Sequence, residues 1–149
     1  METCVFCDIV AGKAPASIVY KGAVVCDFLS IDPVNPGHVL VISKQHLPFL
    51  ADLSEETGSH LFTVTMQMAK ALRHSGVHCG GINLFLADGK AAFQEVFHIH
   101  MHVFHRFEGD PFEIQANWQV KPARQELDEI AARRMRVHEL LRQQIDSNY

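Results

Sequence analysis

The alternation of apolar and polar residues along the chain predicts more strands than helices. Short runs rich in β-branched and aromatic residues, bounded by turn residues, are typical of strands. Such runs occur at Ile18–Tyr20, Val24–Phe28, His38–Ser43 and Gly81–Leu86, and in a last run that contains His98 and ends near Arg106. Because no strand–helix–strand unit repeats, the pattern favours an α+β fold with an antiparallel sheet of about five strands.

One long central helix is predicted from apolar residues at helical spacing. The residues that repeat at this spacing are Leu61, Val64, Met68 and Leu72. Ser54 can cap this helix, which should run to about Ser75 and stop at Gly76. A short helix is expected at Cys7–Lys13, and a C-terminal helix from Pro122 towards Gln143.

Length, composition and charge narrow the class of protein. The chain has 149 residues, 48% of them hydrophobic, and a formal net charge of -4 with neutral histidines. These values predict one domain with a packed core. The acidic balance argues against binding of duplex nucleic acid but is compatible with a small nucleotide. No apolar run approaches the roughly 20 residues of a membrane span, and no signal-peptide pattern opens the chain, so we expect a cytoplasmic protein without membrane contact.

Three alternating histidines form the strongest chemical signal. In a strand, one face would carry His98, His100 and His102, and the other would carry Ile99, Met101 and Val103. Near pH 7 an imidazole can act as nucleophile, base, acid or metal ligand. A surface strand with coincidental histidines and a metal site are the alternatives. The middle position of His100, with a possible partner on each side, favours it as a nucleophile towards phosphorus.

Cys4 and Cys7 form a second candidate group together with histidines elsewhere in the chain. A C-x-x-C pair can be a redox motif, half of a zinc site or neither. A redox motif would follow a strand, whereas this pair lies at the N-terminus. A tetrahedral zinc needs two more ligands, for which His46 and His98 are candidates. His38, which follows a Pro-Gly turn, is either a surface histidine or part of a site.

Taken together, these residues resemble the histidine-triad (HIT) superfamily of nucleotide hydrolases and transferases. The motif His-φ-His-φ-His-φ-φ, where φ is an apolar residue, corresponds to His98–Phe104. The resemblance extends to Cys4–Val10, to the loop and strand Asp32–Ile42, and to the lead-in Ala92–Phe97. It covers about residues 4–106. It therefore implies a HIT-like fold in a single domain, 1–149, with a C-terminal helical extension at about 107–149.

The resemblance also implies a role for each matching residue. His100 would attack the α-phosphate of a nucleotide conjugate, a phosphoramidate or a dinucleoside polyphosphate, and form a nucleotidyl-histidine intermediate that water or another acceptor resolves. His98 would support the nucleophile, and His102 and Gln94 would contact the phosphates. The residues implied for a nucleoside pocket, with a purine favoured, are Phe6, Ile9, Phe28, Ser30, Ile31 and His38. One structural Zn²⁺ would be held by Cys4, Cys7, His46 and His98.

Three positions depart from the pattern of the relatives and bear on substrate preference. Many relatives carry Asp at the ribose-contacting position, where this chain has Ser30. Ala87 stands where Asn is common, and Glu95 where Ser often follows the glutamine. A phosphorylase that uses phosphate as acceptor, and a zinc-containing nucleotide-binding or interaction module with little catalysis, are the alternatives to a hydrolase. Because the relatives are commonly homodimers, we expect a homodimer.

Overall fold

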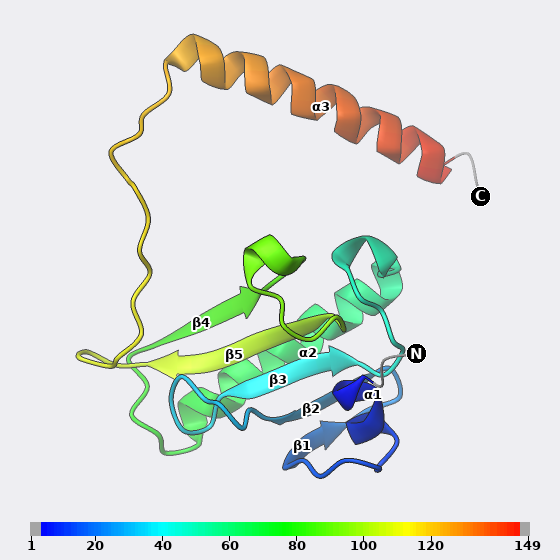
Figure 1. Ribbon diagram of the computed structural model, residues 1–149, viewed down its shortest axis with the longest axis vertical. Helices are drawn as coiled ribbons and strands as arrows, with labels where there is room; N and C mark the ends of the chain where they lie inside the picture. Colours follow the sequence, from blue (N-terminus) through cyan, green and yellow to red (C-terminus); the bar gives the residue numbers. More distant parts are fainter. Residues whose placement is uncertain (1–3, 147–149) are drawn as a thin grey trace. The chain divides into compact units, whose positions relative to one another are not determined.

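The structure is a computed structural model that describes residues 4–146 (Figure 1). The chain divides after Phe112 into two compact units, each of which is described by itself. The first unit contains a five-stranded sheet and two α-helices, and the second contains one long helix. No helix among the described residues is both long and apolar enough to cross a membrane.

The sheet is antiparallel, with the strand order β1-β2-β3-β5-β4. Its strands are β1 (Ile18–Lys21), β2 (Val25–Leu29), β3 (Val39–Ser43), β4 (Gly81–Leu86) and β5 (His100–Arg106). The α+β class and the five antiparallel strands predicted from the sequence are confirmed. The histidine-bearing strand β5 lies between β3 and β4, so neighbours on both sides fix its position.

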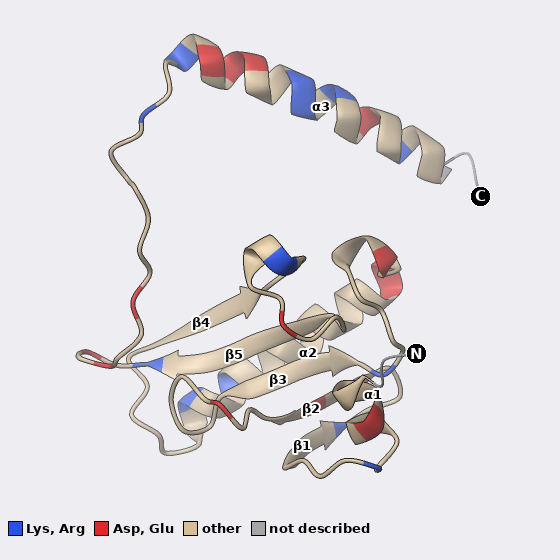
Figure 2. Cartoon of the chain, in the orientation of Figure 1, with Lys and Arg blue, Asp and Glu red and all other residues tan. Residues whose placement is uncertain are grey.

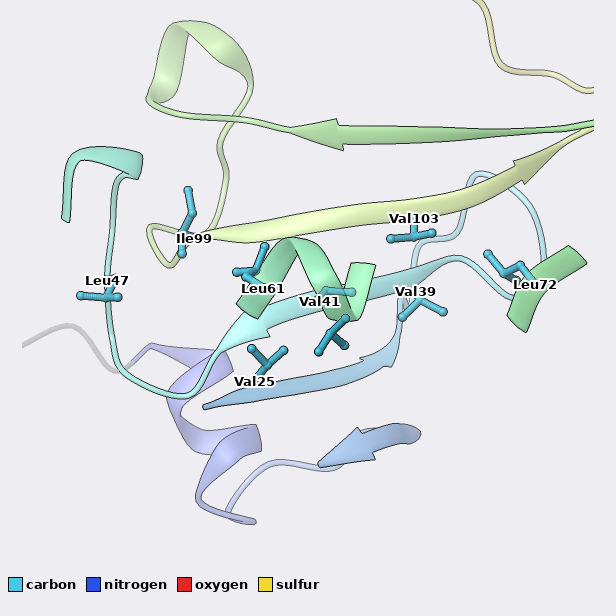
Figure 3. Packing of buried hydrophobic residues seen from close by; sticks show 9 residues of the cluster. Val25, Val39, Val41, Leu47, Leu61, Leu72, Ile99 and Val103 are labelled. Carbon is cyan, nitrogen blue, oxygen red and sulfur yellow. The ribbon is translucent and has the colours of Figure 1, made fainter. Parts of the chain in front are cut away.

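Helix α2 (Glu55–His74) covers one face of the sheet, over β2, β3 and β5. The Ser54 hydroxyl caps its N-terminus by accepting a hydrogen bond from the Thr57 N–H at 3.1 Å, as the sequence predicted. Figure 3 shows the apolar side chains packed between this helix and the sheet. They include Val25, Val39, Val41, Leu61, Leu72 and Val103.

Helix α1 (Val5–Val10) packs against the opposite face of the sheet. Because side chains alternate along a strand, the residues between those of the first core point to α1. The resulting second core consists of Phe6, Ile9, Cys26, Phe28, Leu40 and Ile42. Strands β2 and β3 thus lie between two apolar cores. His100 and His102 point towards the face of the sheet that carries α1.

Most element boundaries differ from the sequence prediction by a few residues, and two of these differences lie beside the site. Strand β5 begins at His100, so the placement of His98 on the same strand was wrong. Its partner β3 ends at Ser43, and the Ile99 N–H bonds to the Leu47 carbonyl of the next segment instead. The first helix begins at Val5 rather than Cys7, because its N-cap, Cys4, makes no side-chain cap hydrogen bond that would mark the start.

Two short 3₁₀ helices, η1 (Leu50–Asp52) and η2 (Lys90–Ala92), complete the first unit. In the second unit, α3 (Arg124–Asp146) begins two residues after Pro122, which agrees with the predicted C-terminal helix. Its one ion pair among the described residues joins Arg124 and Asp128 at 3.0 Å, and both side chains are exposed.

Candidate functional site

A pocket of about 500 Å³ opens on the face of the sheet that carries α1. This volume is typical of small-molecule sites. Among the side chains that form its apolar wall are Phe6, Ile9, Phe28, Phe85, Phe104 and Phe112. The polar side chains that line it are Ser30, Asp32, His38, Glu95, His100 and His102. The pocket therefore joins two of the three predicted triad histidines to the apolar residues predicted for a nucleoside.

His100 is held in one tautomer by the backbone. Its Nδ1 lies 2.6 Å from the carbonyl oxygen of His98, so Nδ1 carries the proton and donates. The lone pair then resides on Nε2, the nitrogen that a nucleophile needs. Burial lowers the pKa of His100, although its hydrogen bond to the His98 backbone opposes the shift. The ring of Phe6, 5.2 Å away and nearly perpendicular, fixes its orientation further.

His38 and His102 are joined by a hydrogen bond, and a backbone N–H beside His38 determines which of the two donates. The Val34 N–H donates to His38 Nδ1 at 3.2 Å, so the proton of neutral His38 is on Nε2. His38 Nε2 lies 2.9 Å from His102 Nδ1 and donates to it. The proton of His102 is therefore on Nε2, where it is available as a donor to a bound ligand.

Burial keeps both members of this pair uncharged at neutral pH. It lowers the pKa of His38 to about 4, and nearby His100 adds to the shift. It lowers the pKa of His102 to about 3, with further contributions from His100 and His38. His102 therefore meets a bound ligand as a neutral hydrogen-bond donor, without a positive charge.

His98 and Gln94 are placed outside the pocket lining. The His98 ring is completely buried and its Nε2 donates to the Ser43 carbonyl at 2.7 Å, while its own carbonyl accepts from His100. The Gln94 amide accepts from the Gly89 N–H and donates to the Pro48 carbonyl, both at 2.7 Å. The pocket therefore brings together His100, His102, His38 and the residues predicted for a nucleoside. Gln94 lies outside it and holds two backbone segments together.

Cys4, Cys7, His46 and His98 form a cluster whose ligand atoms all lie within 4.8 Å of one another. Sulfur-to-Nδ1 distances are 3.5 Å for Cys4–His98, 3.3 Å for Cys7–His46 and 3.7 Å for Cys7–His98. Tetrahedral zinc, with Zn–S of about 2.3 Å and Zn–N of about 2.0 Å, places sulfur and nitrogen ligands about 3.5 Å apart. The hydrogen bond from His98 Nε2 leaves Nδ1 for a metal. The donor set and its geometry thus fit a tetrahedral metal ion.

The part of the pocket wall formed by Phe104 and Phe112 depends on residues that the sequence analysis did not single out. Arg106 pairs with Asp110 through two hydrogen bonds of 2.6 Å, and this pairing holds the pKa of Asp110 well below its usual range. The same carboxylate accepts from the Phe112 N–H at 3.2 Å and from Asn35 at 3.0 Å. Phe112 is thereby fixed edge-to-face on Phe104, with 5.1 Å between ring centroids. Phe104 was predictable in principle, because it shares the strand face of His100 and His102.

An antiparallel five-stranded sheet with paired histidines on an inner strand, open to a pocket beside α1, defines the HIT class of nucleotide-binding hydrolases and transferases. The family model of the HIT domain matches residues 11–109. The chain therefore belongs to the HIT family.

Several relatives and solved structures match most of the chain. An uncharacterized HIT-like protein of Borreliella burgdorferi is 39% identical over 114 residues, which cover 75% of this chain and 81% of the relative. "Protein hit" of Bacillus subtilis is 38% identical over 112 residues, covering 74% and 77%. A HIT family protein of Bacillus anthracis has a TM-score of 0.83 at 34% identity and covers 91% of this chain and 97% of its own. A Zn-bound histidine triad family protein of Mycobacterium smegmatis has a TM-score of 0.72 at 44% identity, covering 83% and 86%.

Proposed function

We propose that this protein cleaves a nucleotide conjugate at its α-phosphate, with transfer of the nucleotidyl group first to His100 and then to water. The observation that carries the proposal is the tautomer of His100. Its Nδ1–H is committed to the His98 carbonyl, so the free lone pair of Nε2 is on the pocket side of the ring. A buried neutral imidazole with that lone pair is a competent nucleophile towards phosphorus.

The first step forms one bond and breaks one. The Nε2 of His100 forms a bond to phosphorus while the bond from phosphorus to the leaving group breaks. The positive charge that develops on the ring is stabilised at Nδ1–H by the His98 carbonyl. The leaving group takes the electron pair and a proton from solvent water, while the Nε2–H of neutral His102 donates a hydrogen bond to it. The hydrogen bond from His38 to His102 Nδ1 keeps that proton on Nε2.

The second step returns the site to its starting state. Water attacks the phosphorus of the nucleotidyl-histidine, and the bond between phosphorus and His100 Nε2 breaks. The proton of the attacking water passes to solvent, and His102 keeps its Nε2 proton throughout. The nucleoside is bound by Phe6, Ile9 and Phe28 in this proposal, with the Ser30 hydroxyl near the ribose.

Rapid quenching tests the proposed intermediate. During turnover of an AMP–amine conjugate, an alkaline quench followed by peptide mass spectrometry should find one AMP group on the peptide that contains His100. A phosphorus–imidazole bond is labile in acid and stable in base, so a parallel acid quench should lose the signal. The matched control is His100→Ala, which lacks the nucleophile and should give no adduct.

Two outcomes would contradict this mechanism. Inversion of configuration at a chiral α-phosphorus in labelled water, without an adduct, would show direct attack by water. Nucleotide binding with neither adduct nor turnover would instead favour the nucleotide-binding module with little catalysis. The homodimer expected from the resemblance, the cytoplasmic location and the phosphate contacts of Gln94 remain predictions.

We also propose that Cys4, Cys7, His46 and His98 bind one structural Zn²⁺. The tetrahedral spacing of the four donors supports this, as does the likeness to the Zn-bound histidine triad family protein of Mycobacterium smegmatis. With all four positions taken by protein, the ion has no open site for substrate. It would fix His98, whose carbonyl orients His100, and tie the N-terminus to the sheet.

Removal of the metal should therefore lower stability more than it lowers the reactivity of His100. In protein purified without chelators, metal analysis should give one zinc per chain. Chelation should lower the Tm by several degrees, because metal binding contributes to folding. The control is Cys79→Ser, which leaves the cluster intact and should keep the zinc. Protein without zinc, whose Cys4 and Cys7 thiols react freely with a thiol reagent, would rule the metal site out.

A further inference from the structure

The pocket contains negative but no positive side chains. Among the described residues that line it, none is Lys or Arg, and two are carboxylates, Asp32 and Glu95. Both are exposed at the pocket, and no ion pair within residues 4–146 neutralises either of them. Figure 2 shows that the Lys and Arg residues of the first unit lie on α2, on η2, at strand ends and in loops, whereas β3 carries no charge. This is an unusual lining for a site that binds phosphate.

The histidines beside the carboxylates do not compensate for this charge. His38 and His102 are uncharged at neutral pH because burial lowers their pKa values to about 4 and about 3. They bind phosphate oxygens as dipolar donors only. A ligand with several phosphates would therefore meet two carboxylates without a matching cation among the lining residues, and like charges repel.

The backbone on both sides of Glu95 is held beside the pocket. The residue before it, Gln94, is buried and is anchored by hydrogen bonds of 2.7 Å to the Gly89 N–H and to the Pro48 carbonyl. The residue after it, Val96, lines the pocket and packs against the second core. Glu95 thus stands on a fixed segment that leads into β5, whereas Asp32 lies on the loop after β2, beside Ser30.

We infer that Glu95 selects substrates by charge: it disfavours polyphosphate leaving groups and favours amine leaving groups that carry a positive charge. This inference rests on the proposed function and names its substrate class, a nucleoside phosphoramidate with a single phosphoryl group at the reacting centre. Asp32, beside Ser30, is on the wall proposed for the ribose, where its charge acts alike on every nucleotide. Glu95 is the residue whose effect depends on the leaving group.

An amine leaving group also agrees with the chemistry of the neighbouring histidines. The phosphorus–nitrogen bond breaks as His100 Nε2 bonds to phosphorus, and the nitrogen takes the electron pair and a proton from solvent water, while His102 Nε2–H donates a hydrogen bond to it. The free amine then gains a proton from water and becomes an ammonium ion. A carboxylate in the pocket stabilises that positive charge, whereas it opposes the departure of a negatively charged phosphate.

Binding to an inactive protein tests the charge selection without turnover. In a His100→Ala background and magnesium-free buffer, calorimetry with AMP, ADP and ATP should give affinities that fall with each added phosphate. Glu95→Gln should tighten ATP binding about five- to tenfold and change AMP binding less than about twofold. The matched control is Glu108→Gln, which makes the same charge change at an exposed position outside the pocket.

Turnover by the active protein tests the leaving-group side. Two AMP phosphoramidates of similar length serve as probes, one made with 1,4-diaminobutane and one with 4-aminobutyrate. The cationic conjugate should have the higher kcat/KM, by about tenfold, and Glu95→Gln should remove most of the difference. Diadenosine tetraphosphate should be a poor substrate that improves in Glu95→Gln.

The outcomes separate this inference from the proposed function. ADP and ATP that bind as tightly as AMP, with no effect of Glu95→Gln, would overturn the charge selection while the nucleotidyl transfer still stood. Equal turnover of the two conjugates would do the same. No binding of any nucleotide would overturn both.

Discussion

A His100→Ala variant should lose at least about a thousandfold in kcat towards an AMP–amine conjugate, which corresponds to about 4 kcal/mol of transition-state stabilisation. His100 is the one pocket histidine whose protonated nitrogen is committed to a backbone carbonyl, at 2.6 Å, so its other nitrogen keeps its lone pair. Without that nucleophile the two-step route is lost. Steady-state assays with purified protein measure the loss, and calorimetry with AMP should show binding within a few-fold of the wild type.

His102→Ala provides the comparison that distinguishes the nucleophile from the hydrogen-bond donor to the leaving group. It should slow the release of a basic amine strongly and the release of 4-nitrophenolate from an AMP ester only weakly, because nitrophenolate leaves without a proton. His100→Ala should slow both reactions alike. A His100→Ala variant that keeps more than about a tenth of the wild-type kcat would mean that another group attacks phosphorus.

The layout of the sheet and of α2 follows from local patterns, which is why the sequence was sufficient to predict both. Alternating residues on β2 and β3 divide cleanly between the two cores, as a period of two requires. The Ser54 cap and the apolar repeat of α2 act within a few residues of the helix itself. The grouping of Cys4, Cys7, His46 and His98 was predictable for a different reason: a C-x-x-C pair can be half of a metal site, which needs two more ligands.

The separate contacts of the His98 ring and of its backbone carbonyl were not predictable, because they depend on where β3 ends. The alternating histidines suggest one strand face, yet the ladder with β3 begins only at His100. His98 therefore turns its ring to Cys4 and Cys7 and offers its carbonyl to His100. The sequence shows the side chain of a residue but not the partner of its backbone.

Polar contacts between residues far apart in the sequence could not be predicted either, because the sequence does not show which residues meet. Asp110 joins the loop that holds Asn35 to the segment that ends at Phe112, across a sequence separation of 75 residues between Asn35 and Asp110. No local periodicity marks such a contact. Likewise, Gln94 matches a family position that implies a phosphate contact, but its amide holds Gly89 and Pro48 in the structure.

One buried residue of β2, Asp27, should make a contribution to the free energy of unfolding that falls as the pH rises from about 4 to about 7. Asp27 is completely buried, and neither carboxylate oxygen has a hydrogen-bond partner among the described residues. It shares the α2-facing side of the strand with Val25 and pairs with Val41 on β3. Burial of the charged form raises the pKa of Asp27 to about 7. An unfolded chain ionises the same group near its usual pKa of about 3.9.

The sign follows from proton binding. Between these two pKa values the folded protein holds a proton that the unfolded chain has released, so raising the pH favours unfolding. Below about pH 4 the cost is absent, and above about pH 7 it reaches its full size of about 4 kcal/mol. Buried His38 and His102 act in the opposite sense, because their pKa values are lowered, and they reduce stability as the pH falls. The contribution of Asp27 is therefore measured as the difference in the free energy of unfolding between the wild type and a variant at this position.

Asp27→Val isolates that difference, since valine suits a strand and matches its neighbours on the face towards α2. Urea unfolding of the zinc-loaded protein at pH 5, 6, 7 and 8 should show a gain in the free energy of unfolding that grows with pH, to about 3 to 4 kcal/mol at pH 8. Asp27→Asn should remove the same pH dependence with a smaller gain, because an unpartnered amide stays buried. Asp88→Asn, at an exposed turn, is the control and should follow the wild type. A gain that is constant from pH 5 to pH 8 would show that Asp27 is charged in the folded protein throughout, and hence that it has a partner that compensates its burial.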